Sequence, residues 1–123
     1  MWDCEREMER IFHIVERGTW ALADSAGEYR PESLQSEGFV HFSFADQVEA
    51  TANLRYADAV NLCVIEIDPE RVGAPVVVED SYSTGTAFPH VYAPIPTAAA
   101  VAIHDLTRSA EGTHRFTPPD APG

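Results

Sequence analysis

The sequence contains no lysine. All 8 basic residues are arginines, whereas 20 residues are acidic, so the formal net charge is −12. Proteins that bind nucleic acid neutralise phosphates with lysine and arginine, and anionic membrane surfaces attract the same side chains. We therefore expect neither nucleic acid nor a membrane as a partner, although a local basic pocket is compatible with a negative net charge.

Cysteine is scarce as well, and long hydrophobic runs are absent. Cys4 lies in a charged stretch, and Cys63 lies in the apolar run 62–67, where we expect a buried free thiol. No signal peptide is recognisable, and no apolar run approaches the ~20 residues that cross a bilayer. We therefore expect a cytoplasmic protein in a reducing compartment.

The 123 residues, of which 45% are hydrophobic, suit one domain with its own core. We predict an N-terminal arm over residues 1–10, a single α+β domain over 11–107, and a disordered, proline-containing tail over 108–123. The polar segment 80–87 is predicted to be a mobile surface loop. Glycine-rich phosphate loops, zinc-binding cysteine pairs and nucleophile elbows do not occur in the sequence.

The hydrophobic pattern predicts several short strands and two helices. One helix should follow Thr19 as its N-cap and end near Gly27; the other should cover 44–56, with Ser43 and Asp46 at capping-box spacing. Because the helices come early and the strands gather late, the pattern indicates an α+β fold. The predicted extended segments are 11–15, 39–43, 62–67, 76–79, 88–92 and 100–106.

Three histidines lie on predicted extended segments, namely His13, His41 and His90. Side chains of a strand alternate between two faces, so His41 should share a face with Ser43, and His90 with Tyr92. Imidazole can act as a general base, a hydrogen-bond donor or a metal ligand. For each histidine the alternative is a buried structural role with a backbone group as its partner.

Two other kinds of site were weighed for these residues. A nucleophilic site could combine Ser43 with His41 or His90 and with Glu79, but neighbours on one strand face rarely align as nucleophile and base, and no oxyanion-hole motif is present. A metal site built from the three histidines is another alternative, although nothing in their spacing demands it. The remaining histidines are interpreted as structural or surface residues: His104 and His114.

Several short blocks of the sequence, taken in their order along the chain, form a recognisable combination. They are Ile11–Ile14, Trp20, Gly27–Tyr29, Ser33–Leu34, Glu37–Ser43, Gln47 and Phe88–Pro94. Together, over about residues 11 to 106, they resemble the family catalogued as domain of unknown function 952. The sequence departs from that family at Ala93, where glycine is usual, and at Phe42, where cysteine is common.

This resemblance implies a fold similar to the ADP-ribosyltransferases, a split, mainly antiparallel sheet with a few short helices. In those enzymes the cleft holds nicotinamide dinucleotide (NAD): a histidine on the first strand holds the nicotinamide ribose, an aromatic residue on the second stacks on the nicotinamide ring, and a late glutamate orients the acceptor. By position, His13 resembles the first of these residues and His41 roughly the second. Either His90 or Glu79 corresponds roughly to the third.

We therefore expect a histidine-lined cleft that binds a nucleotide, or NAD as a substrate, and transfers ADP-ribose or cleaves a glycosidic bond. The alternatives are a non-catalytic module that kept the cleft and lost the chemistry, and a small interaction domain whose histidines are satisfied core residues. The oligomeric state is left open. The candidate catalytic residues are His13, His41 and His90, and the candidate substrate-binding residues are Ser43, Tyr92 and Trp20; no residue is assigned to a metal.

Overall fold

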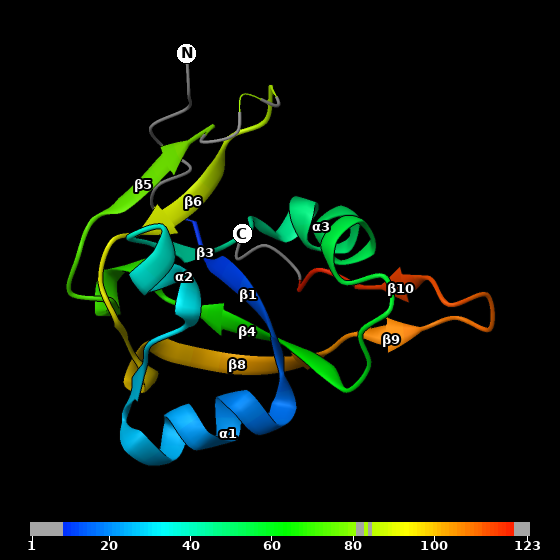
Figure 1. Cartoon of the computed structure of the whole chain (residues 1–123), viewed down its shortest axis with the longest axis horizontal. Helices are drawn as coiled ribbons and strands as arrows, with labels where there is room; N and C mark the ends of the chain where they lie inside the picture. Colours follow the sequence, from blue (N-terminus) through cyan, green and yellow to red (C-terminus); the bar gives the residue numbers. More distant parts are fainter. Residues whose placement is uncertain (1–8, 81–82, 84, 120–123) are drawn as a thin grey trace.

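The computed structural model describes residues 9–80, 83 and 85–119. Over these residues the chain is a mixed α+β fold with antiparallel strand pairs and few short helices (Figure 1). None of the helices in this part of the chain has the length and apolar character that crossing a membrane requires. The elements are β1 Ile11–Glu16, α1 Arg17–Ala26, β2 Glu28–Tyr29, α2 Glu32–Ser36, β3 Val40–His41, α3 Val48–Arg55, β4 Leu62–Ile67, β5 Val76–Glu79, β6 Phe88–Val91, β7 Ile95–Pro96, β8 Ala100–Asp105, β9 Thr107–Arg108 and β10 His114–Arg115.

Two three-stranded antiparallel sheets form the framework. One has the order β1–β4–β8 and the other the order β3–β6–β5. A single bridge joins them among the described residues: Phe12 and Ser43 exchange both backbone hydrogen bonds, each 2.8 Å long. Beyond this bridge β1 stays with β4 and β3 stays with β6, so the two sheets separate. We call this place the split.

Strands β1 and β4 are buried on both faces of their sheet. Ile65 of β4 belongs to a hydrophobic cluster with Trp20 of α1. Val64, which points to the opposite face, packs in a second cluster with Val48 and Ala52 of α3. Burying a large apolar side chain contributes roughly 1.5–3 kcal/mol. Helices α1 and α3 therefore lie on opposite sides of this sheet (Figure 1), and α3 is held firmly against it.

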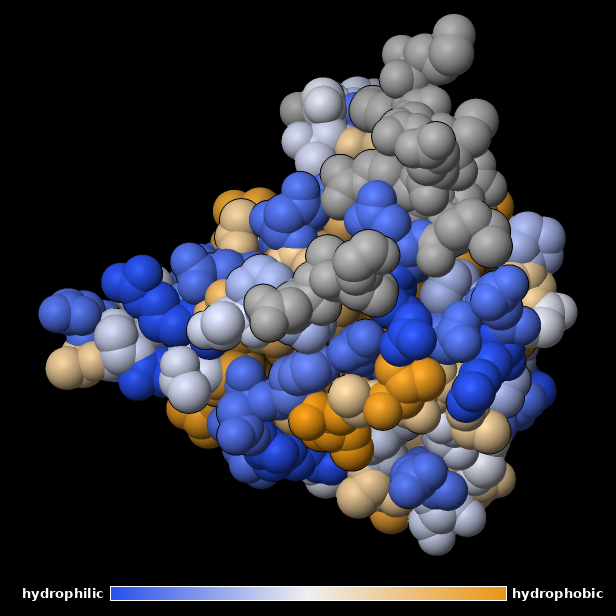
Figure 2. Space-filling view, turned by 180° about the vertical axis from the view of Figure 1, so that it is seen from behind, coloured by the Kyte–Doolittle hydropathy of each residue, from blue (hydrophilic) through white to orange (hydrophobic). Residues whose placement is uncertain are grey.

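The face seen in Figure 2 is mainly hydrophilic. Figure 2 shows this from behind, with a small hydrophobic area among hydrophilic residues in the lower middle of the view. Large apolar side chains that are exposed occur on separate elements, and they include Leu22, Leu54 and Ile103. Scattered exposed apolar residues of this kind are normal for a folded protein.

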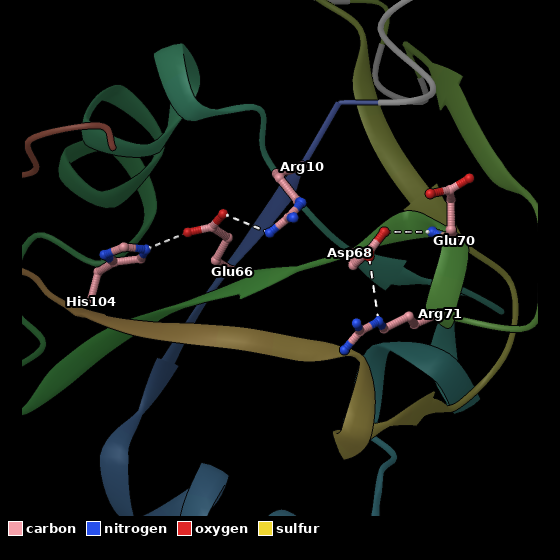
Figure 3. A network of polar contacts seen from close by, with 6 residues as sticks. All are labelled: Arg10, Glu66, Asp68, Glu70, Arg71 and His104. Atoms are coloured by element: carbon pink, nitrogen blue, oxygen red, sulfur yellow. Dashed lines mark hydrogen bonds and ion pairs between the residues drawn. The ribbon is translucent and has the colours of Figure 1, made fainter. Parts of the chain in front are cut away.

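One acidic side chain lies within the buried part of β4. Glu66 is only 9% exposed, and it accepts hydrogen bonds from Arg10 at 3.1 Å and from His104 of β8 at 2.7 Å (Figure 3). A buried carboxylate is costly unless partners compensate for its lost hydration. The two partners, one on each side of Glu66, supply this compensation, which gives His104 the structural role that the sequence suggested.

Helix α1 ends where the sequence predicts but begins earlier. Its C-terminal residue is followed by Gly27 in the left-handed conformation, with φ of 83°, which glycine adopts without strain. The helix starts at Arg17, directly after β1, so Thr19 is not its N-cap. The first backbone N–H groups of a helix have no partner within it. Here the N–H of Arg17 donates to the carbonyl of Asn61 at 3.0 Å, so this group is satisfied without a capping side chain.

The helix predicted over 44–56 begins with the 3-10 turn Ala45–Gln47 and continues as α3. Ser43 is not its cap, because Ser43 is held in the bridge to β1. The capping contact comes instead from Gln47, whose Oε1 accepts a hydrogen bond from the Phe44 backbone N–H at 2.9 Å. The expected pairing of Ser43 with Asp46 is therefore corrected.

The expected disordered tail is also corrected over most of its length. Strands β9 and β10 pair with each other, His114 is 2% exposed, and Phe116 is 7% exposed. The ring of Phe116 packs edge-on against Phe12, with 5.8 Å between centroids. These apolar contacts outweigh the prolines that suggested disorder. Residues 1–8 of the expected arm, 81, 82 and 84 of the expected loop, and 120–123 of the expected tail lie outside the described residues.

Candidate functional site

A cavity of about 280 Å³ lies at the split between the two sheets. Its walls come from β1, α2, β3, α3, β6 and the residues next to them, so it is assembled from segments distant in sequence. Its lining is Phe12, His13, Ile14, Ser33, Glu37, His41, Phe42, Ser43, Thr51, Arg55, Tyr56, Phe88 and His90. The mixture of aromatic rings, imidazoles, hydroxyls and both signs of charge is typical of a small-molecule site.

The structure brings four of the six predicted site residues together in this lining, and these are His13, His41, Ser43 and His90. The other two lie elsewhere. Tyr92, just beyond β6, is 51% exposed, and Trp20 is 5% exposed in the core. The indole of Trp20 packs 5.5 Å from the ring of Tyr29, so its place is that of a core residue.

His13 is held by both of its ring nitrogens. Nδ1 lies 2.6 Å from the backbone carbonyl oxygen of His41, and Nε2 lies 2.6 Å from the hydroxyl of Tyr29. Since a carbonyl only accepts, Nδ1 carries the proton and Nε2 accepts from the phenol. Burial lowers the pKa of His13 to about 4, although the bond to the His41 carbonyl acts in the opposite direction. His13 is therefore neutral near pH 7, with both nitrogens engaged.

The imidazole of His13 also explains why the sheets separate. In a regular antiparallel ladder the next hydrogen-bonded pair after Phe12 and Ser43 would be Ile14 and His41. Here the carbonyl of His41 accepts from the His13 ring instead. The same alternation directs the backbone N–H and C=O of Ile14 toward the β3 side, where Ile14 lines the cavity.

His41 and His90 lie directly opposite each other on neighbouring strands. They are Cα partners in the pairing of β3 with β6, and their ring centroids are 5.4 Å apart at 82°. Nε2 of His41 lies 2.8 Å from a carboxylate oxygen of Glu37, and Nδ1 of His90 lies 2.8 Å from one of Glu79. Two histidine–carboxylate pairs thus lie next to each other, and of their four residues Glu37, His41 and His90 line the cavity.

The pair formed by His90 and Glu79 has a defined charge state. Burial lowers the pKa of His90 and outweighs the opposite effect of Glu79. Burial alone would raise the pKa of Glu79, but hydrogen bonds donated by Tyr92 and His90 bring it below its usual value. Near pH 7 we therefore expect an ionised Glu79 and a neutral His90 that donates from Nδ1. In this tautomer Nε2 carries the lone pair and can accept a proton.

The ring plane of His90 is fixed by an aromatic neighbour. Phe39 stacks on it with 4.1 Å between centroids and 22° between planes. Phe39 itself is 6% exposed and also contacts the ring of Tyr92 at 5.1 Å. Tyr92 donates its hydroxyl to Glu79, which raises the pKa of the phenol. Tyr92 therefore supports the site from outside the cavity.

Ser43 is placed differently from what a nucleophilic site requires. Its hydroxyl donates to Thr51 Oγ1 at 3.5 Å, so its hydrogen bond within the described part of the chain goes to a hydroxyl and not to an imidazole. For the metal alternative, no group of three or more His, Cys, Asp or Glu side chains among the described residues is arranged to hold an ion. Both nitrogens of His13 are in addition already engaged.

Several residues of the site were not assigned from the sequence. Glu37 and Tyr29 hold histidines, while Thr51 and Arg55 line the cavity from α3. The signal for the last two was available, since residues four apart share one face of a helix. For Tyr29 no spacing rule applies, because its contact with His13 depends on how β2 docks against β1.

The sequence model of a family described as "Protein of unknown function (DUF952)" matches residues 14–103. No curated protein matches the chain. The crystal structure of protein CC0527 from Caulobacter crescentus is similar, with a TM-score of 0.76, 27% identity, and coverage of 86% of this chain and 93% of that one. The solution NMR structure of CC0527 gives a TM-score of 0.67 at 25% identity, covering 85% and 90%.

Proposed function

The chain belongs to the DUF952 family of proteins of unknown function, and we propose that its cavity binds a nucleoside-sized part of a nucleotide, such as the nicotinamide–ribose half of NAD. The observation that carries the proposal is the cavity of about 280 Å³ with three histidines and several aromatic rings in its walls. This volume is close to the lower end of the range for ligand pockets, roughly 300–1,000 Å³. It therefore suits one heterocycle and its ribose, while the remainder of a dinucleotide would lie outside.

The chemistry of the walls suits this kind of ligand. Phe12, Phe42 and Phe88 offer ring surfaces to a planar heterocycle. The backbone groups of Ile14, directed to the same side, can recognise an amide on that heterocycle. Glu37 and the imidazole of His41 can accept and donate hydrogen bonds to ribose hydroxyls.

The proposal extends to an ADP-ribosyltransferase-like fold and activity. Its support is the arrangement of two antiparallel three-stranded sheets that separate at β1 and β3, with a cavity in the split. His13 lies on the first of these strands and His41 on the second, which are the positions that the resemblance implies. The late glutamate of the ADP-ribosyltransferases corresponds roughly to His90 or Glu79. These two residues are hydrogen-bonded to each other here.

The reaction that these groups can support is cleavage of the bond between C1′ of the ribose and the ring nitrogen. The bonding electron pair leaves with the heterocycle, and the positive charge that develops on the ribose is stabilised by the carboxylate of Glu37, which lines the cavity. A hydroxyl of water or of an acceptor then forms the new bond at C1′. Its proton passes to Nε2 of His90, which the ionised Glu79 supports as a base.

A non-catalytic binding module is the second candidate. The observation that favours it is that both nitrogens of His13 and a nitrogen of His41 already have protein partners. A cavity of this kind can bind without turnover. Release of free nicotinamide from NAD, followed by liquid chromatography, separates the two candidates, because only an enzyme produces it.

The proposal is tested by a thermal-shift screen of the wild type and His41→Ala against NAD, nicotinamide riboside and adenosine. We expect at least one compound to stabilise the wild type and His41→Ala to lose most of that stabilisation, because the variant removes one wall of the cavity. Val60→Ala is the matched control, since Val60 is 66% exposed and absent from the lining. A His41→Ala protein that binds as well as the wild type, or a wild type that binds none of the compounds, would contradict the proposal.

A further inference from the structure

The cavity has two chemically different ends, and from them we infer that it holds a phosphate group of its ligand at the end formed by α3, with Arg55 as the main contact. We place Glu37, His41 and His90, which line the cavity and contact one another, at the opposite end. The inference rests on the proposed function and adds to it the class of ligand, a nucleoside phosphate, and its direction in the cavity.

The residues of the α3 end lie on a helix that is anchored in the core. Thr51 and Arg55 are four residues apart on α3 and both line the cavity. A neighbouring stripe of the same helix is anchored in the core by Val48 and Ala52, both with 0% exposure. Ser43, whose Oγ is 3.5 Å from Thr51 Oγ1, is 4% exposed.

The donors at this end match a tetrahedral oxyanion. Within the described lining Arg55 is the sole arginine, in a chain that has no lysine and a net charge of −12. Its planar guanidinium can donate two parallel hydrogen bonds to a phosphate. The hydroxyl of Thr51, which accepts from Ser43, adds its own O–H as a donor, and Tyr56 adds a phenol. Burial raises the pKa of Tyr56 despite the opposite effect of Arg55, so the phenol keeps its proton and can donate it.

The number of these donors distinguishes between anions. A phosphomonoester has three terminal oxygens, whereas a carboxylate has two and would leave part of the donor set without a partner. The other end of the cavity repels an anion, because Glu37 lies there. The phosphate therefore points toward α3, and the heterocycle and its ribose point toward His41 and His90.

A purely structural role for Arg55 makes a different prediction. Arg55 is the last residue of α3, where a positive charge stabilises a helix through its dipole. Under that reading, loss of the charge lowers the stability of the protein and leaves ligand preference unchanged. The discriminating measurement is therefore the difference in affinity between two ligands that differ by one phosphate.

We propose to measure binding of nicotinamide riboside and nicotinamide mononucleotide, which form such a pair, by calorimetry with the wild type and Arg55→Gln. We expect the wild type to bind the mononucleotide roughly ten- to hundredfold more tightly, the usual range for hydrogen bonds to a charged group. Arg55→Gln should lose this preference and keep its affinity for the riboside. Arg55→Lys should keep part of the preference, and Thr51→Val should reduce it.

Two controls keep the outcomes distinct. Arg30→Gln removes an arginine that is ion-paired with Glu28 on the surface and should leave the preference intact. Inorganic phosphate, compared with chloride at equal ionic strength, should raise the melting temperature of the wild type and not that of Arg55→Gln. The phosphate measurement requires no nucleoside, so it tests the α3 end by itself.

Each result then supports or overturns a particular claim. Equal affinity of the wild type for the riboside and the mononucleotide overturns the phosphate site and leaves the proposed function standing. A preference for the mononucleotide that survives in Arg55→Gln has the same consequence. An Arg55-dependent effect of inorganic phosphate without nucleoside binding supports the phosphate site and contradicts the proposed function. If the wild type binds neither the riboside nor the mononucleotide and inorganic phosphate does not stabilise it, both the phosphate site and the proposed function are overturned. If Arg55→Gln does not fold, Arg55→Lys and Thr51→Val decide the question.

Discussion

At the scale of single residues, His13 is the side chain on which the geometry of the site depends. It is 9% exposed and donates to the carbonyl that a regular ladder would pair with Ile14. Its Nε2 also accepts a hydrogen bond from the hydroxyl of Tyr29. These bonds require the neutral imidazole, because a protonated Nε2 could not accept from the phenol. The separation of the two sheets is therefore linked to the protonation state of one buried histidine.

This linkage predicts a loss of stability in acid. The pKa of His13 in the folded protein is about 4, below its ordinary value of 6.5, so the unfolded chain binds the proton more readily. The contribution of neutral His13 to the free energy of unfolding is roughly 3 kcal/mol. It is complete above pH 6.5 and is lost as the pH falls toward 4. Denaturant unfolding of the wild type and His13→Phe between pH 4 and 7 measures it: the variant should be less stable at pH 7, and the gap should narrow in acid.

Other groups titrate in or near this window and set the control. His90 has a lowered pKa as well, so its protonation also lowers the stability of the folded protein in acid. The wild type and His13→Phe share this loss, and it cancels in the difference between them. Glu79 also has a lowered pKa, and its contribution is lost only at lower pH, as the carboxylate is protonated. A gap between wild type and His13→Phe that stays constant from pH 7 to 4 would show that His13 does not titrate as proposed.

At the scale of elements, the sequence predicts those whose signal is local. Strand β4 begins and ends where the sequence predicts. The reason is that its run of mostly apolar residues is followed directly by Asp68 and a proline, which end the strand. Strand β3 is shorter than predicted, since its partners are β6 and one bridge to β1. Beyond His41 the chain leaves the regular strand, so Phe42 lines the cavity together with Ser43, and the predicted alternation of faces fails there.

The C-terminal segment was misjudged because its composition conceals one apolar contact. Phe116 packs against the rings of Phe12 and His104, with centroids 5.8 and 5.9 Å away. Its backbone N–H donates to Glu49 of α3 at 2.9 Å. His114 fixes the same polar segment through its backbone N–H, which donates to Asn53 at 2.7 Å. No periodicity in the sequence predicts isolated contacts of this kind.

We predict that Phe116→Ala lowers the free energy of unfolding by about 3–5 kcal/mol, as is usual for removing a buried phenylalanine. The reason is that the side chain is 7% exposed and belongs to the cluster beneath α3. Urea unfolding followed by circular dichroism measures the change. Leu54→Ala on α3, at a position that is 80% exposed, is the control and should change stability little. Equal stabilities for Phe116→Ala and the wild type would restore the disordered tail.

At the scale of the whole molecule, the site could be predicted only in part. The histidines were found because imidazoles are unusual on short buried strands. Glu37 and Tyr29 were not, because they lie at the end of α2 and on the short strand β2, whose positions relative to β1 depend on packing. The spacing of Thr51 and Arg55 places them on one helix face, but only the docking of α3 shows that this face borders the cavity. Trp20 was included through the resemblance, yet it supports Tyr29 from the core. Sequence patterns locate chemistry along a strand, whereas a cavity requires the relative placement of elements.

The net charge of −12 leads to a prediction about the molecule as a whole. With 20 acidic and 8 basic residues, repulsion between surface carboxylates opposes the compact state. Added salt shortens the screening length from about 30 Å at 0.01 M to about 8 Å at 0.15 M. We therefore expect the melting temperature at pH 7 to rise by a few degrees over this range of sodium chloride, equivalent to about 1 kcal/mol.

The sign of this salt effect distinguishes repulsion from ion pairing. The bond between Arg10 and Glu66 is partly buried and is screened little, whereas exposed pairs such as Arg30 with Glu28 contribute little at any salt concentration. Near the isoelectric point of about 4.6 the net repulsion vanishes, so the same addition of salt should have a much smaller effect there. A melting temperature that falls with salt at pH 7 would mean that attractive pairs outweigh the excess of carboxylates.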